Sequence, residues 1–128
     1  MAYYEAQTVD YSYEEALEKV TAELKEEGFG ELTEIDIKET LKQKIDVDFR
    51  KYKILGACNP GFANQALNIE DKVGVFLPCN VVVQETLEGK TEVFAMNPME
   101  AMSAIDKPEL QDVAAEVTNR LNRVLERI

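Results

Sequence analysis

Two short segments of the chain place a cysteine and an asparagine directly after an apolar run. The first spans residues 55–60 (LGACNP) and the second spans residues 76–81 (FLPCNV). Cysteine thiolates attack electrophiles and bind soft metal ions, so a pair of such segments points to thiol chemistry or to a binding site. Cys58 and Cys79 are too far apart in sequence for a C-x-x-C redox motif. Two cysteines alone also do not define a zinc site, which takes four ligands.

Cys58 stands directly before a predicted helix start. Asn59 is a favoured N-cap and Pro60 suits the first helical position, where its missing N–H has no partner to lose. The positive end of the helix would favour the thiolate of Cys58, and Lys53 on the preceding strand would add to this effect, with Arg50 or Lys51 beside it. This pattern favours a reactive thiol, or an anion site built from helix amides and Lys53. The alternative is a small, buried, inert cysteine at a tight strand–helix junction.

Cys79 and Asn80 lie inside the most β-like stretch of the chain. Cys79 is either a second member of the site or an inert core thiol. Asn80 needs an explanation, because a buried amide without partners costs about 1–3 kcal/mol. It either satisfies a carbonyl at a bulge near Pro78 or faces a cavity. The candidate ligand-binding residues are therefore Lys53, Cys58, Asn59, Cys79 and Asn80, and the two cysteines are the candidate metal ligands.

The composition removes several classes of function. The chain contains no histidine, which excludes a histidine-based catalytic triad and a histidine-based zinc site. Its net charge is −11, and residues 1–48 carry 14 acidic and 5 basic side chains. A chain with this much negative charge repels phosphate groups. We therefore expect neither nucleic acid nor an anionic membrane surface as a partner. The acidic face of the first helix is either a solvated surface or a docking site for a basic partner.

Length and hydropathy indicate one compact unit. The chain has 128 residues, of which 45% are hydrophobic, and this predicts a single domain over 1–128. Its apolar runs are too short for a membrane span of about 20 residues. The first residues lack the basic and apolar regions of a signal peptide. Two cysteines in such a context predict free thiols and a cytoplasmic location.

Several elements must position the two cysteines. A strand over residues 3–9 precedes a helix that starts with the capping box Ser12-x-x-Glu15 and stops at Gly28. A short strand over 31–35 leads to a short helix with Ile37, Leu41 and Ile45 on one side. Strands are predicted over 49–58, 73–85 and 91–96, and a helix begins at Pro60 and runs to about Leu67. Within the strand over 73–85, Pro78 indicates a bulge or a local edge.

The last helix has the clearest pattern. Asp106 is its expected cap and Pro108 its expected first residue. Its apolar residues recur in steps of three and four, with two more widening the stripe: Leu110, Val113, Ala114, Val117, Leu121, Val124, Leu125 and Ile128. Such a stripe is typical of a helix packed across a sheet. The fold class predicted is α+β, with a single antiparallel or mixed sheet, helices packed on one face and a long C-terminal helix.

Four segments in order carry a family resemblance: residues 33–38 (TEIDIK), 47–49 (VDF), 52–60 (YKILGACNP) and 77–83 (LPCNVVV). The chain resembles domain-of-unknown-function family 302 of bacteria and archaea, from the first helix to the last. The resemblance implies a small α+β domain whose sheet is covered by helices, and it makes a homodimer an expectation. It implies no established activity, cofactor or catalytic residue, but it directs attention to the two Cys-Asn segments.

Three functions compete at this point. The first, which we favour, is a binding module in which both Cys-Asn segments line one pocket for a small molecule or a soft metal ion; in a dimer, two chains could supply four thiolates. The second is a thiol-dependent enzyme or redox sensor using Cys58, with Lys53 lowering its pKa. The third is an acidic interaction or regulatory domain that uses Glu14, Glu18 and Glu26. Spacing along the chain does not decide whether Cys58 and Cys79 meet.

Overall fold

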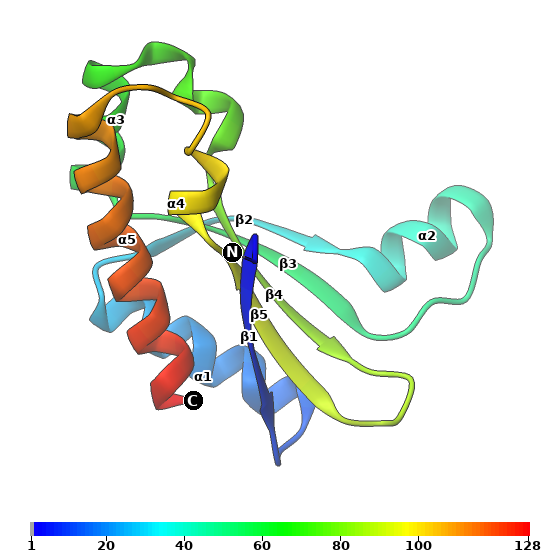
Figure 1. Ribbon diagram of the computed structural model, residues 1–128. Helices are drawn as coiled ribbons and strands as arrows, with labels where there is room; N and C mark the ends of the chain where they lie inside the picture. Colours follow the sequence, from blue (N-terminus) through cyan, green and yellow to red (C-terminus); the bar gives the residue numbers. More distant parts are fainter. Residues whose placement is uncertain (1) are drawn as a thin grey trace.

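A computed structural model describes residues 2–128 as one five-stranded sheet with helices packed against it (Figure 1). Every pair of neighbouring strands is antiparallel. In spatial order the strands are β1 (Tyr4–Val9), β5 (Thr91–Met96), β4 (Cys79–Glu85), β3 (Tyr52–Cys58) and β2 (Gly30–Asp36). The predicted α+β class, the antiparallel sheet and the long C-terminal helix are confirmed.

The helices differ in how they meet the sheet. The two longest, α1 (Tyr13–Glu26) and α5 (Pro108–Arg127), pack against one face, and α3 (Pro60–Ile69) lies beside α5. The short helices η1 (Asp71–Phe76) and α4 (Pro98–Ala101) lie close to α3 and α5. By contrast, α2 (Ile37–Ile45) projects beyond the end of β2, away from the other helices (Figure 1).

Local sequence signals explain where α1 begins and ends. The Ser12 hydroxyl accepts a hydrogen bond from the backbone N–H of Glu15 at 3.1 Å, as the capping box predicts. After the helix, Gly28 adopts a positive φ of 85°, a conformation that side chains disfavour. The buried residues of the helix recur in steps of three and four and are Tyr13, Ala16, Val20 and Leu24.

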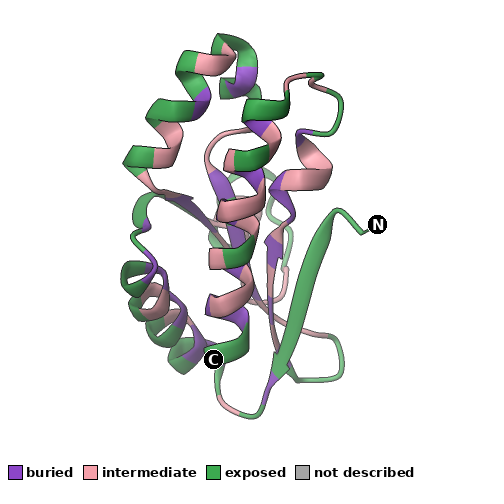
Figure 2. Ribbon diagram, turned by 60° about the vertical axis from the view of Figure 1, so that its left-hand side comes forward, coloured by how far each residue is buried: buried purple, intermediate pink, exposed green. Residues whose placement is uncertain are grey.

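The main core lies between the sheet and the two long helices. On β4 and β5, Val81, Val83 and Val93 are at most 1% exposed. They pack with Leu121 and Val124 of α5, and Figure 2 shows the buried stripe of α5 facing the sheet. A second, smaller core joins α3, η1, α4 and the start of α5, through Ala66, Val73, Met102, Leu110 and Ala114.

Several predicted boundaries are wrong. The strand expected over 49–58 begins at Tyr52. The strand expected over 73–85 begins at Cys79, because Val73 is a buried anchor of the second core and its segment forms η1. The last helix starts at Pro108 as expected, but its N-cap is Lys107, without a side-chain cap bond, and not Asp106. The amino group of Lys107 instead pairs with Glu70 at 3.0 Å, which ties the start of α5 to the end of α3.

One buried carboxylate clamps the helix layer. Glu27, in the turn after α1, is 5% exposed. Its oxygens pair with Arg123 at 2.9 Å and with Arg127 at 2.6 Å, both on α5. Its carbonyl accepts hydrogen bonds from Arg120 at 3.1 Å and from the side-chain amide of Asn59 at 3.4 Å. A single residue therefore connects α1, α5 and the start of α3.

We predict that Glu27→Gln lowers the free energy of unfolding by about 1–3 kcal/mol, because it removes charged hydrogen bonds from a buried position. The hydrogen bonds from Arg123, followed by those from Arg127, lower the pKa of Glu27 from 4.5 to about 2. The unfolded carboxyl therefore takes up its proton first as the pH falls, so the native protein loses this stabilisation from about pH 5 down to about pH 2.

Urea denaturation at neutral and acid pH measures both effects. The variant should lose less stability between pH 5 and pH 3 than the native protein, and Glu26→Gln, at the exposed neighbouring position, is the matched control. If the native protein and Glu27→Gln lost the same amount of stability between pH 5 and pH 3, the ion pairs of Glu27 would not be the cause of the loss.

Candidate functional site

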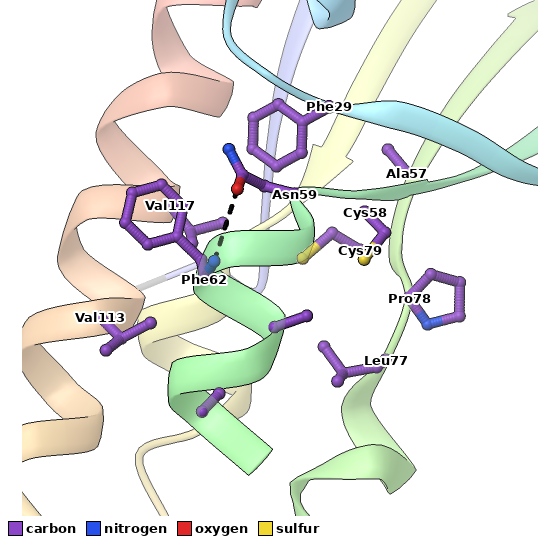
Figure 3. Close-up of a pocket in the computed structure, with 12 residues that line it drawn as sticks. Phe29, Ala57, Cys58, Asn59, Phe62, Leu77, Pro78, Cys79, Val113 and Val117 are labelled. Atoms are coloured by element: carbon purple, nitrogen blue, oxygen red, sulfur yellow. Dashed lines mark hydrogen bonds between the residues drawn. The ribbon is translucent and has the colours of Figure 1, made fainter. Parts of the chain in front are cut away.

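The two cysteines line one pocket. β3 and β4 are neighbours in the sheet, and their register pairs Ala57 with Cys79, so Cys58 is one residue away from the residue opposite Cys79. Both side chains reach a cavity between these strand ends and helices α3 and α5 (Figure 3). The lining residues are Phe29, Ala57, Cys58, Asn59, Phe62, Ala63, Ala66, Leu77, Pro78, Cys79, Val113 and Val117. Apart from the two thiols and one amide, the lining side chains are apolar.

The cavity is small. Its volume is about 30 Å³, and on the same measure a cavity needs about 10–15 Å³ to hold one water molecule. Pockets that hold small organic ligands are typically about 300–1,000 Å³. The space beside the thiols therefore suits a single atom or ion far better than an organic molecule.

The position of Cys58 follows from the sharp change from strand to helix. Asn59 caps α3 as predicted: its Oδ1 accepts the N–H of Phe62 at 3.4 Å, and Pro60 is the first helical residue. The Nδ2 of Asn59 donates to the carbonyl of Glu27 at 3.4 Å. The oxygen of the Asn59 side chain thus caps α3, and its nitrogen binds the turn after α1. These two hydrogen bonds fix the position of the residue next to Cys58.

The position of Cys79 depends on a close approach at Gly56. A Cβ atom added to Gly56 would collide with Thr33 Oγ1 and lie 2.7 Å from Cγ of Pro78. Glycine therefore lets the segment before β4 lie directly against β3, and Pro78 leads into Cys79 along the wall of the cavity. The Leu77–Pro78 peptide bond is cis.

The environment keeps Cys79 protonated. Burial raises the pKa of its thiol from 9.0 to about 11, and the nearby Cys58 adds to the increase. An apolar surrounding disfavours the charged thiolate, because the ion loses its hydration without gaining a partner. Cys79 is buried and Cys58 is half-buried, so Cys58 is the more accessible of the two.

Lys53 lies outside this pocket. It stands near the first residue of β3, whereas Cys58 ends the strand, and an extended strand spans about 3.3 Å per residue. The amino group of Lys53 pairs with Glu34 at 2.7 Å. Its two basic neighbours are also engaged elsewhere, Lys51 with Glu14 and Arg50 with Gln84. The expectation that this basic cluster acts on the Cys58 thiol is therefore not met.

Asn80 also lies outside the pocket. Successive side chains on a strand point to opposite faces, so Asn80 faces away from the cavity that Cys79 lines. It is exposed and pairs in register with Gly56. It therefore neither satisfies a buried bulge nor faces the cavity, and the expected burial of its amide is wrong.

Several residues that close the pocket carried no chemical signal in the sequence. Val113 and Val117 of α5 were assigned only to the packing stripe, and Phe29 stands between two glycines after α1. Phe62 covers the pocket from α3, and the guanidinium of Arg120 lies 5.1 Å from its ring. Apolar walls of this kind arise from contacts between distant segments, which local spacing does not reveal.

The described part of the chain limits the chemistry further. Within residues 2–128, no three His, Cys, Asp or Glu side chains gather in a way that would hold a metal ion. The two thiols are therefore the donors that one protomer brings to this pocket. None of the helices in the same range is long and apolar enough to cross a membrane.

Comparison with known proteins gives the family. None of the curated proteins matches the chain. The crystal structure of an uncharacterized conserved protein DUF302 from Bacillus stearothermophilus is similar over 99% of this chain and 98% of that chain, with 33% sequence identity and a TM-score of 0.92. The family model described as domain of unknown function DUF302 matches residues 5–128. The chain therefore belongs to the DUF302 family, as the Cys-Asn segments and their order along the sequence indicated.

Proposed function

We propose that this DUF302 chain is a binding module that holds one soft metal ion, such as Cu(I), between the sulfur atoms of Cys58 and Cys79. The observation that carries the proposal is that both thiols line one apolar cavity with room for a single ion. The two cysteines come from neighbouring strands, so the sheet itself keeps them together.

The donor set favours a soft monovalent ion over zinc. Thiolates are soft ligands and select soft ions. The monovalent ions Cu(I) and Ag(I) accept two ligands in a linear arrangement. Zn²⁺ takes four ligands in structural sites, and within residues 2–128 no third acidic, histidine or cysteine ligand joins the two thiols. The small cavity also argues against the small organic ligand that the sequence left open.

Binding must displace protons from the thiols. A metal ion is held by thiolates, and Cys79 has a pKa of about 11. At neutral pH the ion therefore competes with a proton for this sulfur. The apolar wall that raises the pKa also excludes water from the bound ion, which strengthens the bonds to sulfur once they form.

A reversible disulfide is a second candidate function, supported by the lining of one cavity by both thiols. A peroxide would supply the oxidising power. The Cys58 thiolate attacks one peroxide oxygen and releases water after protonation, and Cys79 then displaces a second water from the sulfenic acid to form the S–S bond.

The remaining alternatives have less support. A thiol enzyme in which Lys53 activates Cys58 conflicts with the Lys53–Glu34 pair. For a docking site on the acidic face of α1, Glu18 and Glu26 are exposed. Glu14 already pairs with Lys51 at 2.8 Å, which leaves it less available to a basic partner. A cytoplasmic location and a homodimer are likewise proposals.

We predict that the protein binds Ag(I) or Cu(I) at a ratio of one ion per chain. Cys58→Ser and Cys79→Ser should each weaken binding by more than about 100-fold, because removing a partner outside the ligand set already costs about 10–100-fold. Native mass spectrometry gives the ratio, and competition with a chromophoric chelator gives the affinity. Asn80→Ser, which alters the exposed neighbour of Cys79, is the control. Equal binding by native and cysteine variants would rule out the site.

We predict that the affinity for the ion rises at least about tenfold per pH unit between about pH 6 and pH 9. The pKa of Cys79 lies near 11, so its proton is displaced on binding throughout this range. Chelator competition at several pH values, corrected for the chelator's own protonation, measures the slope. A flat profile would mean that Cys79 does not bind as a thiolate.

For the disulfide, we predict that hydrogen peroxide lowers the mass of the reduced protein by about 2 Da and that dithiothreitol reverses the change. Cys79→Ser should instead leave a sulfenic acid on Cys58 that dimedone traps. Mass spectrometry of the intact protein and of peptides distinguishes these products. If Cys79→Ser and the native protein gave the same oxidised products, Cys79 would have no part in the reaction.

A further inference from the structure

A second hollow lies directly outside the cysteine pocket, on the surface between α3 and α5. We call it the outer groove. Its volume is about 510 Å³, whereas that of the pocket is about 30 Å³. Phe62 of α3 and Val113 of α5 line both hollows, so these two side chains form the partition between them. On the inner side of the partition lie the two thiols, of which Cys79 is buried and Cys58 is half-buried.

Phe62 is the part of this wall that can move without a change in the backbone. It is half-buried, and Figure 3 shows its ring between α3 and α5, from where it can turn into the outer groove. Val113 is β-branched and has one strongly preferred χ1 rotamer in a helix. Elsewhere in the wall, Pro78 is a closed ring, Leu77 packs against the second core and Phe29 is only 3% exposed.

Arg120 of α5 holds the Phe62 ring from the surface side. Its guanidinium lies 5.1 Å from the centre of the ring, within the range of a cation–π contact. The guanidinium is itself fixed, because Nε donates to Glu116 at 3.0 Å and Nη1 donates to the carbonyl of Glu27 at 3.1 Å. A weak contact from a firmly held cation therefore stabilises the closed position of the ring.

We propose that Phe62 is a gate to Cys79. Its ring turns into the outer groove to admit an ion or a small reagent, and Arg120 favours the return of the ring to the closed position. Because Cys58 is half-buried, a reagent can reach it before the gate opens, whereas Cys79 lies behind the gate. The gate governs access for any reagent of the thiol, and its role in metal uptake rests on the proposed function.

The charge of the outer groove selects what arrives at the gate. Three of its lining residues are acidic and the others are uncharged; the acidic ones are Glu109, Asp112 and Glu116. Glu116 pairs with Arg120, whereas Glu109 and Asp112 are exposed to solvent. A hollow lined by one sign of charge concentrates ions of the opposite sign. The groove therefore favours cations and disfavours anions, and a neutral peroxide can enter.

Alkylation of Cys79 by maleimides of two sizes tests the gate. In a Cys58→Ser background Cys79 is the one thiol of the chain, and mass spectrometry follows its reaction. Each rate is divided by the rate with the amino acid cysteine. Phe62→Ala should accelerate N-cyclohexylmaleimide at least about tenfold more than N-methylmaleimide, because a buried group reacts through its open state. A lower pKa of the thiol would accelerate both reagents equally, so the ratio isolates the gate.

Variants at Arg120 keep the ring and change only what holds it. Arg120→Gln should accelerate N-cyclohexylmaleimide about 2–5-fold, the factor that corresponds to an exposed cation–π contact. Arg120→Lys restores a cation and should return the rate towards that of the background protein. Leu67→Ala, at an exposed position of α3 outside both hollows, is the control and should react as the background protein does. Urea denaturation checks that each variant is folded under the reaction conditions.

Reagents of opposite charge test the selection by the groove. Methanethiosulfonates that carry a trimethylammonium or a sulfonate group react with Cys79 in the same background. Replacing Glu109 by Gln and Asp112 by Asn should lower the ratio of the cationic to the anionic rate about 3–10-fold at low ionic strength. The matched control replaces two exposed acids of α1, Glu18 and Glu26, by Gln and should change the ratio less.

Stopped-flow loading with Ag(I) connects the gate to the metal site. In the protein with both cysteines, Arg120→Gln should accelerate loading and release by the same factor and leave the affinity unchanged. A protein that takes up no Ag(I) would contradict the metal site, whereas the alkylation rates decide on the gate. Equal acceleration of both maleimides by Phe62→Ala, or no effect of Arg120→Gln, would overturn the gate. A charge ratio that the groove variant leaves unchanged would overturn its selection of cations.

Discussion

The buried carboxylate of Glu27 is the interaction on which the helix layer depends. Its oxygens hold Arg123 and Arg127, and its carbonyl receives Arg120 and the amide of Asn59. Asn59 is also the N-cap of α3 and the residue next to Cys58, so the ion pairs that dock α5 on α1 also set the position of the cysteine pocket. A charge removed from water at this point is stable only because both arginines approach it together.

The alternation of side chains along the strands gives the sheet two surfaces with different environments. On β4, Cys79, Val81 and Val83 face the helices, while Asn80 and Val82 face the other way. The helix side buries the core and forms the small cavity at the strand ends. One register therefore places the core and the cysteine pocket on the helix side of the sheet and leaves Asn80 and Val82 on the other side.

The sequence predicted the features that local chemistry determines. The capping box at Ser12, the Asn59 cap and the stripe of α5 all depend on residues within one or two turns, and each was found. The predictions that failed concern distant groups. Val73 was assigned to a strand because of its type, yet packing against the second core places it in η1. Lys53 was assigned to the Cys58 site, yet its partner is Glu34 on the adjacent strand.

The common pocket of the two cysteines is another feature that depends on contacts between distant segments. Their common pocket follows from the β3–β4 register and from the close approach at Gly56, neither of which spacing reveals. The burial that this packing produces raises the pKa of Cys79, so a free thiolate is disfavoured there. In the proposed function, a soft cation or a sulfur–sulfur bond would remove that cost. The small volume of the cavity is the reason for proposing a single ion or a direct bond in place of an organic ligand.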